Sequence, residues 1–555
     1  MSYIRLFTRT PGEGDEYPSA LAYSIHMEVS KDGNEYEILN QNYGILFAEA
    51  NIRENNTIDE RGAMYPVMAK RAAGGYGFLA HRVDKDGNVD EAVADKILYW
   101  KTEDMEHFTD VGLMSYDEAA ADLGVDADSL KELCAQKNDT YEMEISEEEY
   151  NAIRRLWIPI YNTGVEYSEN LTVSSEDDLK GIKVRALYSD GSYHDKYVSI
   201  DASQIDFAKG GTYTVKGVMT QPEYKFPLAE GYADPIVFFY EGKWYFIATN
   251  DNTDDVGLFV RGADTIDGLF AKDVEEHVIL DYDEEKQFIQ TFWAPEFHMI
   301  GGSVYILFAV GPKSWGPHSH MMKLKEGGNI LNANDWETPV KVVRKDGSPI
   351  EKGGITLDMT YLKVNNKSYL VWSERYHIGS DLDSGSMIYI AETNEEKPYV
   401  ITSEPMLLTR PLYGWEHQYG TINNEGPYPL VTDNKVHIAY SGGSAGGYSY
   451  VVANMTADID ADLLDINSWT KSVTPLLSAH SVEGEYGPGH NGFYKDENGD
   501  TWITYHAKLT PGWATRSTAI RRVHFDVYGD PVYNMSKDRD IDPKYKELTF
   551  NVTVK

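Results

Sequence analysis

The sequence predicts a mostly β protein whose larger part is a five-bladed β-propeller, and a five-fold repeat is the main reason. Each repeat has a Gly or Asn, two further residues, an aromatic residue or His, and then alternating apolar residues. Such alternation is typical of a half-buried strand that follows a turn. Repeats of this length and β character fit four-stranded propeller blades. The ring positions recur every 60 to 68 residues, at Tyr245, Tyr305, Tyr369, His437 and Trp502.

The chain before the repeats changes character twice. Its first part alternates apolar runs with turn signals such as Lys31-Asp-Gly33, which predicts blade-like β structure. Two Ser-x-x-Glu capping boxes, at Ser115 and Ser146, then predict a short helical connector. Short strands with turn residues between them follow and predict an immunoglobulin-like β-sandwich. The expected domains are a β-rich N-terminal region, a helical connector, the sandwich and the propeller, over residues 1–114, 115–163, 164–221 and 222–555.

The composition excludes several classes of protein. A formal net charge of −39 disfavours nucleic acids and anionic membranes, whose phosphate groups are bound by clustered Lys and Arg. The single cysteine, Cys134, allows no internal disulfide framework and no multi-cysteine zinc site. No apolar run is long enough to span a bilayer, and the first residues lack a signal-peptide core. We therefore expect a neutral partner such as a glycan, and a protein that is cytoplasmic or secreted with its signal removed.

A second feature of the repeats predicts chemistry in the central channel. If the repeated pattern marks the second strand of each blade, residues 11 or 12 positions earlier lie on or near the innermost strand. Charged side chains are costly there unless they are paired or used. We therefore predict one axial pocket lined by three carboxylates, a tryptophan and a histidine. These residues are Asp234, Trp293, Asp358, Glu425 and His490.

The short contexts of these five residues resemble the motifs of glycoside hydrolase family 43. In order, they are Ala-Asp234-Pro, Trp293-Ala-Pro-Glu, Leu-Asp358-Met-Thr, Asn-Glu425-Gly-Pro and Gly-Pro-Gly-His490-Asn. The resemblance covers the chain after about residue 222 and implies a five-bladed propeller that needs no organic cofactor. By motif, it implies that Asp234 is the general base and Glu425 the general acid. Asp358 would tune a pKa and orient its neighbours.

These roles fit the chemistry of an inverting glycosidase. One carboxylic acid protonates the leaving oxygen, and one carboxylate activates water on the other face of the sugar. A Glu that stays protonated near neutral pH needs a raised pKa, and a nearby anion such as Asp358 can raise it. The alternatives are structural: Asp234 and Glu425 could belong to ordinary turns, and Asp358 could be a buried structural carboxylate.

Further residues could line the pocket or hold a metal. Trp293 could stack on a sugar or fill the core, and Glu296 is expected to hold its loop. The expected pocket-wall residues are Trp372, Arg375, Trp415 and His506. His490 resembles a histidine that lies beside an axial metal, often calcium, in related enzymes. The alternative is a histidine that is only hydrogen-bonded.

Three segments resemble the family members that act on arabinose: Tyr389-Ile-Ala-Glu, Trp415-Glu416 and residues 463–469. The resemblance implies an exo-acting α-L-arabinofuranosidase that releases arabinose from arabinan, arabinoxylan or their oligosaccharides. One alternative is a β-xylosidase on xylo-oligosaccharides, because the two sugars present similar hydroxyls. Another is a non-catalytic glycan-binding propeller, which would not need the carboxylates. Fructan hydrolases, metalloproteases, P-loop proteins and serine hydrolases are disfavoured because their motifs are absent.

Overall fold

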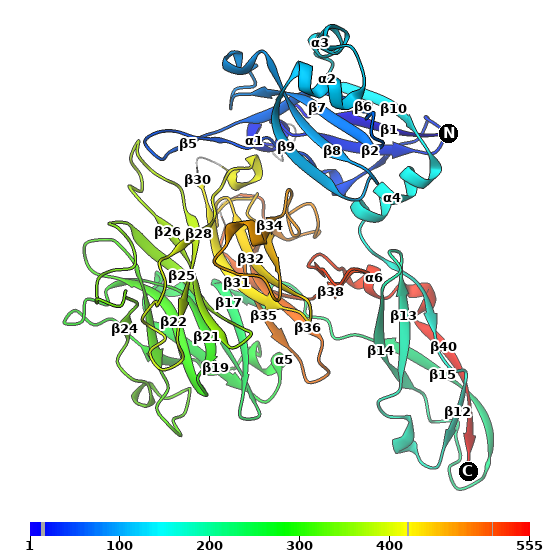
Figure 1. Ribbon diagram of the computed structural model, residues 1–555. Helices are drawn as coiled ribbons and strands as arrows, with labels where there is room; N and C mark the ends of the chain where they lie inside the picture. The colour runs from blue at the N-terminus through cyan, green and yellow to red at the C-terminus, as the bar shows by residue number, and fades with distance from the viewer. Residues whose placement is uncertain (13–16, 419–420, 513) are drawn as a thin grey trace. The chain divides into compact units, whose positions relative to one another are not determined.

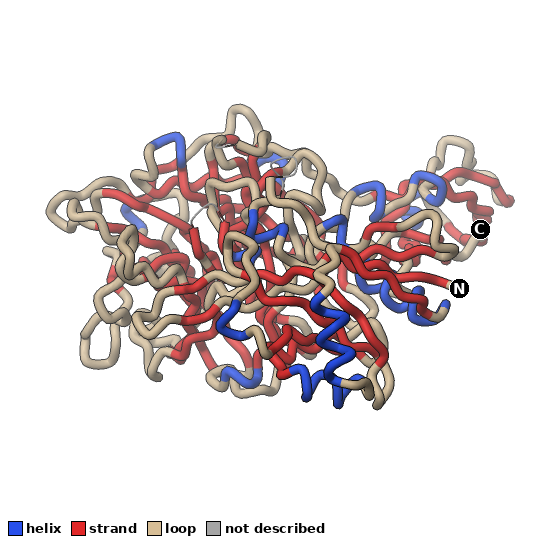
Figure 2. The backbone as a smooth tube through the Cα atoms, turned by 90° about the horizontal axis from the view of Figure 1, so that it is seen from above, coloured by secondary structure: helices blue, strands red, loops and turns tan. Residues whose placement is uncertain are grey.

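The computed structural model describes residues 1–12, 17–418, 421–512 and 514–555, and these are mostly β (Figure 1). Figure 2 shows the helices as a few short segments among the strands. The chain separates into two compact units, and each is formed by two stretches of sequence. The first unit contains Met1–Leu156 and Phe226–Ile520, and the second contains Trp157–Lys225 and Arg521–Lys555.

Five four-stranded antiparallel sheets form most of the first unit. In four of them each strand pairs with the next along the chain. The first sheet contains β17 (Tyr232–Tyr240), β18 (Lys243–Asn250), β19 (Leu258–Ala263) and β20 (His277–Leu280), and the second contains β21 (Gln290–Ile300), β22 (Ser303–Gly311), β23 (His318–Lys323) and β24 (Val340–Lys341). The third contains β25 (Ile355–Val364), β26 (Lys367–Arg375), β27 (Met387–Thr393) and β28 (Met406–Thr409). The fourth contains β31 (Asn424–Val431), β32 (Lys435–Gly442), β33 (Val451–Asp458) and β34 (Trp469–Lys471).

The fifth sheet contains strands from both ends of residues 226–520, the second stretch of the first unit. It contains β35 (Tyr486–Lys495), β36 (Thr501–Lys508) and β37 (Ser517–Arg522), and its outer strand is β16 (Ala229–Glu230) from the start of the stretch. The first strands of neighbouring sheets contact one another in the closed order β17, β21, β25, β31, β35 and back to β17. The five first strands therefore surround one axis.

The repeated sequence pattern marks a hairpin in each sheet. Its glycines and asparagines lie at turns between the first and second strands, and Gly242, Gly302, Asn366 and Gly499 have positive φ. Such turns favour glycine and asparagine because other side chains clash in this backbone conformation. The ring residues that follow lie on the second strands. Positions 11 or 12 residues earlier therefore lie on the first strands, as the sequence predicts.

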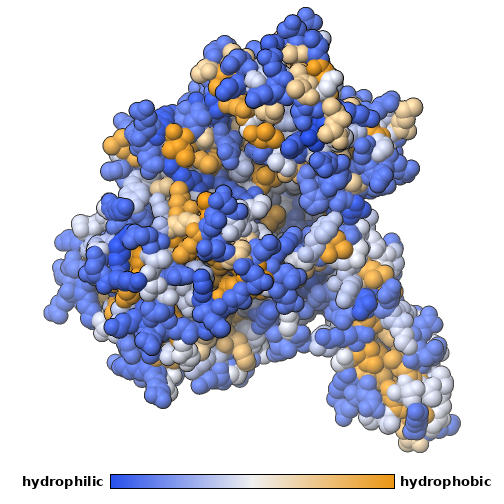
Figure 3. Space-filling view, in the orientation of Figure 1, coloured by the Kyte–Doolittle hydropathy of each residue, from blue (hydrophilic) through white to orange (hydrophobic). Residues whose placement is uncertain are grey.

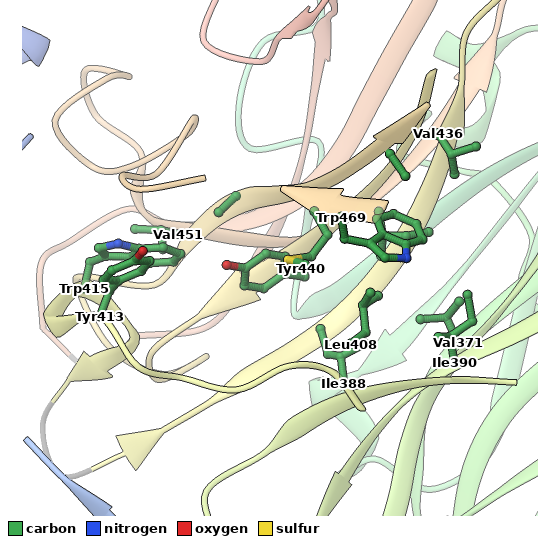
Figure 4. Packing of buried hydrophobic residues seen from close by; sticks show 14 of the residues in the cluster. Val371, Ile388, Ile390, Leu408, Tyr413, Trp415, Val436, Tyr440, Val451 and Trp469 are labelled. Carbon is green, nitrogen blue, oxygen red and sulfur yellow. The ribbon is translucent and has the colours of Figure 1, made fainter. Parts of the chain in front are cut away.

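Apolar side chains fill the space between neighbouring sheets. The third and fourth sheets, for example, bury Val371, Ile390 and Val436 together in one cluster (Figure 4). Similar clusters lie between the first and second sheets and between the second and third. Burial of apolar area is the main source of stability in such packing. The polar residues of the axis are thus held by apolar layers on either side.

The residues before 157 form the N-terminal part of the first unit, with two four-stranded sheets. One sheet contains β1 (Ser2–Phe7), β2 (His26–Ser30), β3 (Glu37–Ile38) and β10 (Thr140–Ile145). The other contains β6 (Gly62–Lys70), β7 (Tyr76–Val83), β8 (Lys96–Thr102) and β9 (Phe108–Ser115), with α2 (Tyr116–Leu123) and α3 (Ala127–Ala135) packed against it.

The expected helical connector differs from the structure in one respect. Both capping boxes form, at Ser115 with Glu118 and at Ser146 with Glu149. Between these helices, however, β10 pairs with β1 along its whole length. Along β10, exposed residues alternate with more buried ones, as in a strand with one face on a core. The segment therefore folds back onto the N-terminal sheet. Residues 115–156 are therefore part of the same unit as residues 1–114.

The second unit contains one six-stranded sheet, in the order β11 (Asn162–Glu166), β13 (Lys183–Tyr188), β14 (Tyr193–Ile200), β15 (Gly211–Thr220), β40 (Glu547–Val554) and β12 (Asn170–Val173). The chain's last strand, β40, pairs with β15 and β12. Residues 521–555 therefore belong to the second unit, and the expected propeller domain of residues 222–555 ends earlier than predicted. This strand joins the second unit because its alternate residues Leu548, Phe550 and Val552 are apolar and lie in the buried cluster of the six-stranded sheet.

Apolar residues also gather on the face of the second unit seen in Figure 3. None of the described helices is long and apolar enough to cross a membrane.

Candidate active site

The same backbone irregularity occurs near the start of all five first strands. In each, the register shifts at a β-bulge, and one residue of the bulge has a left-handed conformation. Bulges re-aim side chains, and strained residues of this kind concentrate at functional sites. The bulge residues are Asp234, Ala294, Asp358, Gly426 and His490, with φ values of 54°, 45°, 52°, 58° and 48°. Trp293 and Glu425 each lie one residue before the bulge residue.

Asp234 is a buried carboxylate that stays ionised. Its Oδ2 accepts a 2.6 Å hydrogen bond from Thr249, and its Oδ1 lies 3.2 Å from Nδ1 of His490 and 3.6 Å from Nη1 of Arg516. Burial opposes its ionisation, but the charges of His490 and Arg516 outweigh burial and hold the pKa of Asp234 well below its usual range. At neutral pH this group can accept a proton.

Glu425 has the opposite character. Its Oε1 accepts a 3.0 Å hydrogen bond from the Tyr450 hydroxyl, and its Oε2 accepts one of 3.1 Å from Nδ2 of Asn423. Burial and the nearby charge of Asp358 raise the pKa of Glu425 to about 7. Its side chain is only half-buried. Glu425 is therefore partly protonated at neutral pH and able to donate a proton.

Asp358 is the third carboxyl group of this network and interacts electrostatically with both Asp234 and Glu425. Its Oδ2 accepts hydrogen bonds from the backbone amide of Gly426 at 3.0 Å and from the Ser373 hydroxyl at 3.2 Å. Burial raises the pKa of Asp358, and the charge of Asp234 adds to this effect. The axis thus holds two buried carboxyl groups, Asp234 and Asp358, and the half-buried Glu425, and their proton affinities differ.

His490 is the cation of this site. Burial lowers its pKa, but the charges of Asp234, Asp358 and Glu425 outweigh burial and raise it above the ordinary value. Its Nδ1 faces Asp234, as in an ion pair. Among the described residues, no group of three or more His, Cys, Asp or Glu side chains is placed to hold a metal ion. The expected calcium beside His490 stays a prediction.

Two expected pocket-wall residues lie in this network. The guanidinium of Arg375 donates to both carboxylate oxygens of Asp383, at 2.8 and 2.7 Å, and to Oδ1 of Asn423 at 3.1 Å. Asn423 in turn donates to Glu425, so Arg375 orients the acid's partner. His506 is fully buried, so it supports Asp234 from behind and does not line the pocket wall as expected; burial lowers its pKa to about 4. This neutral ring accepts from the backbone amide of Asp234 at 3.3 Å.

The comparisons with known proteins agree with this geometry. The family model described as "Glycosyl hydrolases family 43" matches residues 273–531. A curated relative from Streptomyces chartreusis, named "Extracellular exo-alpha-(1->5)-L-arabinofuranosidase", is 30% identical over 358 residues, which are 61% of this chain and 96% of the relative. The chain belongs to glycosyl hydrolase family 43.

Two further proteins are similar to this family 43 chain. A relative of the same name from Streptomyces avermitilis is 30% identical over 57% of this chain and 64% of its own length. The chain therefore spans less than two thirds of that relative. Among solved structures, an α-L-arabinofuranosidase from Lactobacillus brevis is 27% identical, with a TM-score of 0.49, and covers 56% of this chain and 96% of its own.

Two tryptophans expected in the pocket wall lie in the core of the family 43 protein, which corrects that prediction. Trp372 is fully buried between the second and third sheets, and its Nε1 donates to Glu374 at 3.1 Å. Trp415 is fully buried beside Tyr440 (Figure 4), and its Nε1 donates to the Val473 carbonyl at 3.1 Å. Neither ring can contact a substrate. The neighbouring residues in the sequence do not distinguish a buried tryptophan from an exposed one.

Trp293 and Glu296 lie on the first strand of the second sheet, β21, and differ in burial. Trp293 is half-buried, and its Nε1 donates to Oδ2 of Asp255 at 2.7 Å, so its ring is not fully enclosed in the core. Glu296 is buried 2.7 Å from Nε2 of His298, whose pKa burial lowers to about 3. Burial also raises the pKa of Glu296 well above its ordinary value, so a neutral pair holds this part of β21.

Three residues of the site were missed by the sequence reasoning. Tyr450 and Asn423 hold the two oxygens of Glu425, and Arg516 pairs with Asp234. Arg516 is itself fixed by Asp251, to which its Nε donates at 3.1 Å. Tyr450, Asn423 and Arg516 lie in segments between the strands, outside the repeated register. No pattern in the sequence alone marks them.

Proposed function

We propose that this chain is an inverting, exo-acting α-L-arabinofuranosidase. The observation that carries the proposal is the opposite tuning of two carboxyl groups in one buried network. Asp234 has a lowered pKa, and Glu425 has a pKa raised to about 7. Pairs of carboxyls whose environments push their pKa values apart are typical of acid and base partners. Asp358 is assigned the tuning role because its charge raises the pKa of Glu425.

The mechanism follows from these roles. Asp234 removes a proton from a water molecule as the water oxygen attacks the anomeric carbon. Glu425 gives its proton to the glycosidic oxygen as the bond from the anomeric carbon to that oxygen breaks. The sugar leaves with inverted configuration, Asp234 holds the water's proton, and exchange with solvent restores both groups. Inversion needs about 6.5–9.5 Å between the two carboxyls, so that the water fits between base and sugar.

The choice of arabinose rests on the relatives' names and on three segments of sequence. Two curated relatives at 30% identity are named exo-α-(1→5)-L-arabinofuranosidases. The segments that resemble arabinose-acting members add to this, although Trp415 in one of them is a core residue. We propose arabinan, arabinoxylan or their oligosaccharides as the neutral plant-cell-wall substrate. The word "Extracellular" in both names supports the secreted alternative over the cytoplasmic one.

We also infer that the five sheets are the blades of one five-bladed propeller and that the second unit is an immunoglobulin-like module. The cyclic contacts of the five first strands and their shared bulge support the first inference. The antiparallel strands β11, β13, β14, β15 and β40 support the second. Under this proposal the blades extend from β16 to β37, and the module contains residues from both sides of them.

A panel of nitrophenyl glycosides tests the proposed function. We expect the α-L-arabinofuranoside to be hydrolysed faster than the β-D-xyloside, and the galactoside least. Faster turnover of the xyloside would favour the β-xylosidase alternative. Binding of arabino-oligosaccharides with no hydrolysis of any substrate would favour a glycan-binding propeller. The Asp234→Asn variant serves as the control, because it keeps the pocket's shape and removes the base.

A further inference from the structure

The N-terminal part of the chain lies outside the matched residues 273–531 but contacts His480, which packs against the loop that holds Glu425. The contact is made at His480, in the segment between β34 and β35. The rings of Tyr17 and Tyr43, from the N-terminal part, lie 5.3 and 5.4 Å from the His480 ring, centroid to centroid. Tyr448 lies 6.3 Å away, and its hydroxyl is 3.5 Å from Nε2 of His480. His480 thus joins two tyrosines of the N-terminal part to one of the propeller.

Tyr448 belongs to the loop that holds the candidate acid. This loop, residues 443–450, connects β32 to β33 and ends at Tyr450, whose hydroxyl donates to Glu425 at 3.0 Å. The Tyr450 ring is stacked on His506 at 5.4 Å, and a Cβ at Gly489 would lie 2.2 Å from it. The loop's carbonyl at Gly447 accepts from Nζ of Lys508. One side of the loop is therefore fixed by the axial strands.

Polar and apolar contacts beside the loop strengthen its link to the N-terminal part. The Thr474 hydroxyl donates to the Gly44 carbonyl at 2.8 Å and accepts from Nδ2 of Asn40 at 3.2 Å. Tyr43 is almost fully buried and belongs to the same apolar cluster as Val451, the residue after Tyr450. The N-terminal part therefore completes the core on which the loop rests.

We propose that the N-terminal part positions the general acid. Tyr17 and Tyr43 hold His480 against Tyr448, and this packing fixes loop 443–450 so that the Tyr450 hydroxyl meets the carboxyl group of Glu425. His480 and Tyr448 are positioning residues, since they act on the reaction through Tyr450. The proposal rests on the proposed function only in the role of Glu425 as acid.

The charges around Glu425 give the direction of the expected effect. Burial and Asp358, on β25, raise the pKa of Glu425, while His490 on β35, Tyr450 and Arg375 on β26 lower it. A carboxylate is stabilised by a donated hydrogen bond. A displaced Tyr450 therefore raises the pKa of Glu425 further. Because the acid must be protonated, the alkaline limb of the pH–rate profile then moves to higher pH.

Four variants of the full chain test this proposal. His480→Ala removes the ring between the two parts, His480→Phe keeps a ring there, and Tyr450→Phe removes the hydroxyl from Glu425. Tyr36→Phe is the control, because its hydroxyl bonds to Glu142 at 2.6 Å inside the N-terminal part. The readouts are hydrogen–deuterium exchange of the peptide 443–450 and pH–rate profiles on an alkyl arabinofuranoside, whose poor leaving group needs the acid.

We expect His480→Ala to speed exchange in peptide 443–450 and to lower kcat/KM about tenfold, equivalent to about 1.4 kcal/mol. Its alkaline limb should move to higher pH, as in Tyr450→Phe, and the double variant should be no worse than Tyr450→Phe alone. His480→Phe should restore both readouts, and Tyr36→Phe should resemble the wild type. Exchange and alkaline limb unchanged in a folded His480→Ala would overturn the proposal. If the wild type hydrolyses no arabinofuranoside, the proposed function fails, and the exchange data still decide whether His480 fixes the loop.

Discussion

The carboxylate of Asp358 accepts a 3.0 Å hydrogen bond from the backbone amide of Gly426, the residue that follows Glu425. This bond joins the first strands of two neighbouring sheets at their bulges. It places a buried negative charge beside the chain segment that carries the candidate acid. A like charge nearby disfavours ionisation, so Asp358 raises the pKa of Glu425. The carboxylate of Asp358 thus contacts the bulge next to the candidate acid and also raises the pKa of that acid.

Replacing Asp358 by Asn should lower the pKa of Glu425. The change removes the neighbouring charge but leaves an oxygen that can accept from Gly426. Glu425 would then lose its proton at lower pH, and the alkaline limb of the pH–rate profile would move downward from about 7. The measurement is kcat/KM against pH with an alkyl arabinofuranoside, whose poor leaving group needs the acid. An alkaline limb that stays in place or rises would show that Asp358 does not tune the acid.

Trp415→Ala should destabilise the protein without changing how it binds substrate. Trp415 is fully buried, and a large-to-small change in a core costs about 3–5 kcal/mol. Urea denaturation measures this loss, and KM measured on the folded variant should match the wild type. Trp293→Ala is the matched comparison, since that ring is half-buried beside the site and its loss should raise KM. A raised KM for Trp415→Ala at unchanged stability would contradict this prediction and show that Trp415 lines the pocket wall.

A buried ion cluster in the second unit should make its stability depend on pH. Asp540 lies 2.7 Å from Nζ of Lys196 and accepts from Nε of Arg522 at 2.8 Å. Burial opposes its ionisation, but Arg522 and Lys196 outweigh burial and lower the pKa of Asp540. A lowered folded-state pKa means that its stabilisation is complete above the unfolded value of about 4 and is lost as pH falls below it.

Asp540→Asn should therefore cost about 3–5 kcal/mol at pH 7, because it removes the negative charge that both buried cations, Lys196 and Arg522, contact. The difference from the wild type should shrink as pH falls below about 4. Asp177→Asn is the control, since its ion pair with Lys180 is exposed and should matter little. Equal urea midpoints for Asp540→Asn and the wild type at pH 7 would contradict this account.

The repeat was enough to predict the first strands and the residues at their bulges. The turn glycines and alternating apolar residues determine where each hairpin lies, and Asp234, Asp358 and His490 follow from a fixed count back from the ring. The same local signal could not place Trp415, because a core tryptophan and a pocket tryptophan have similar neighbours in sequence. Nor could it place Tyr450, whose contact with Glu425 depends on how a loop between strands folds back.

The division of the chain was also beyond local patterns. In β40, apolar and polar residues alternate as in any half-buried strand. Its pairing with β15, more than 300 residues earlier, depends on the apolar faces that the two strands bury together. The packing of Tyr43 against His480 is of the same kind. Such contacts are decided by the fit of whole surfaces, which no short motif describes.

The most direct test of the acid and base assignment compares Glu425→Gln and Asp234→Asn on two arabinofuranosides, one with a dinitrophenyl and one with an alkyl leaving group. General acid and base groups each contribute about 10²–10⁴-fold to the rate. Glu425→Gln should lose this factor on the alkyl substrate and keep most of its rate on the activated one, which needs no acid. Asp234→Asn should lose the factor on both. Near-native turnover by Asp234→Asn, together with an inert Glu425→Gln on the activated substrate, would contradict the assignment.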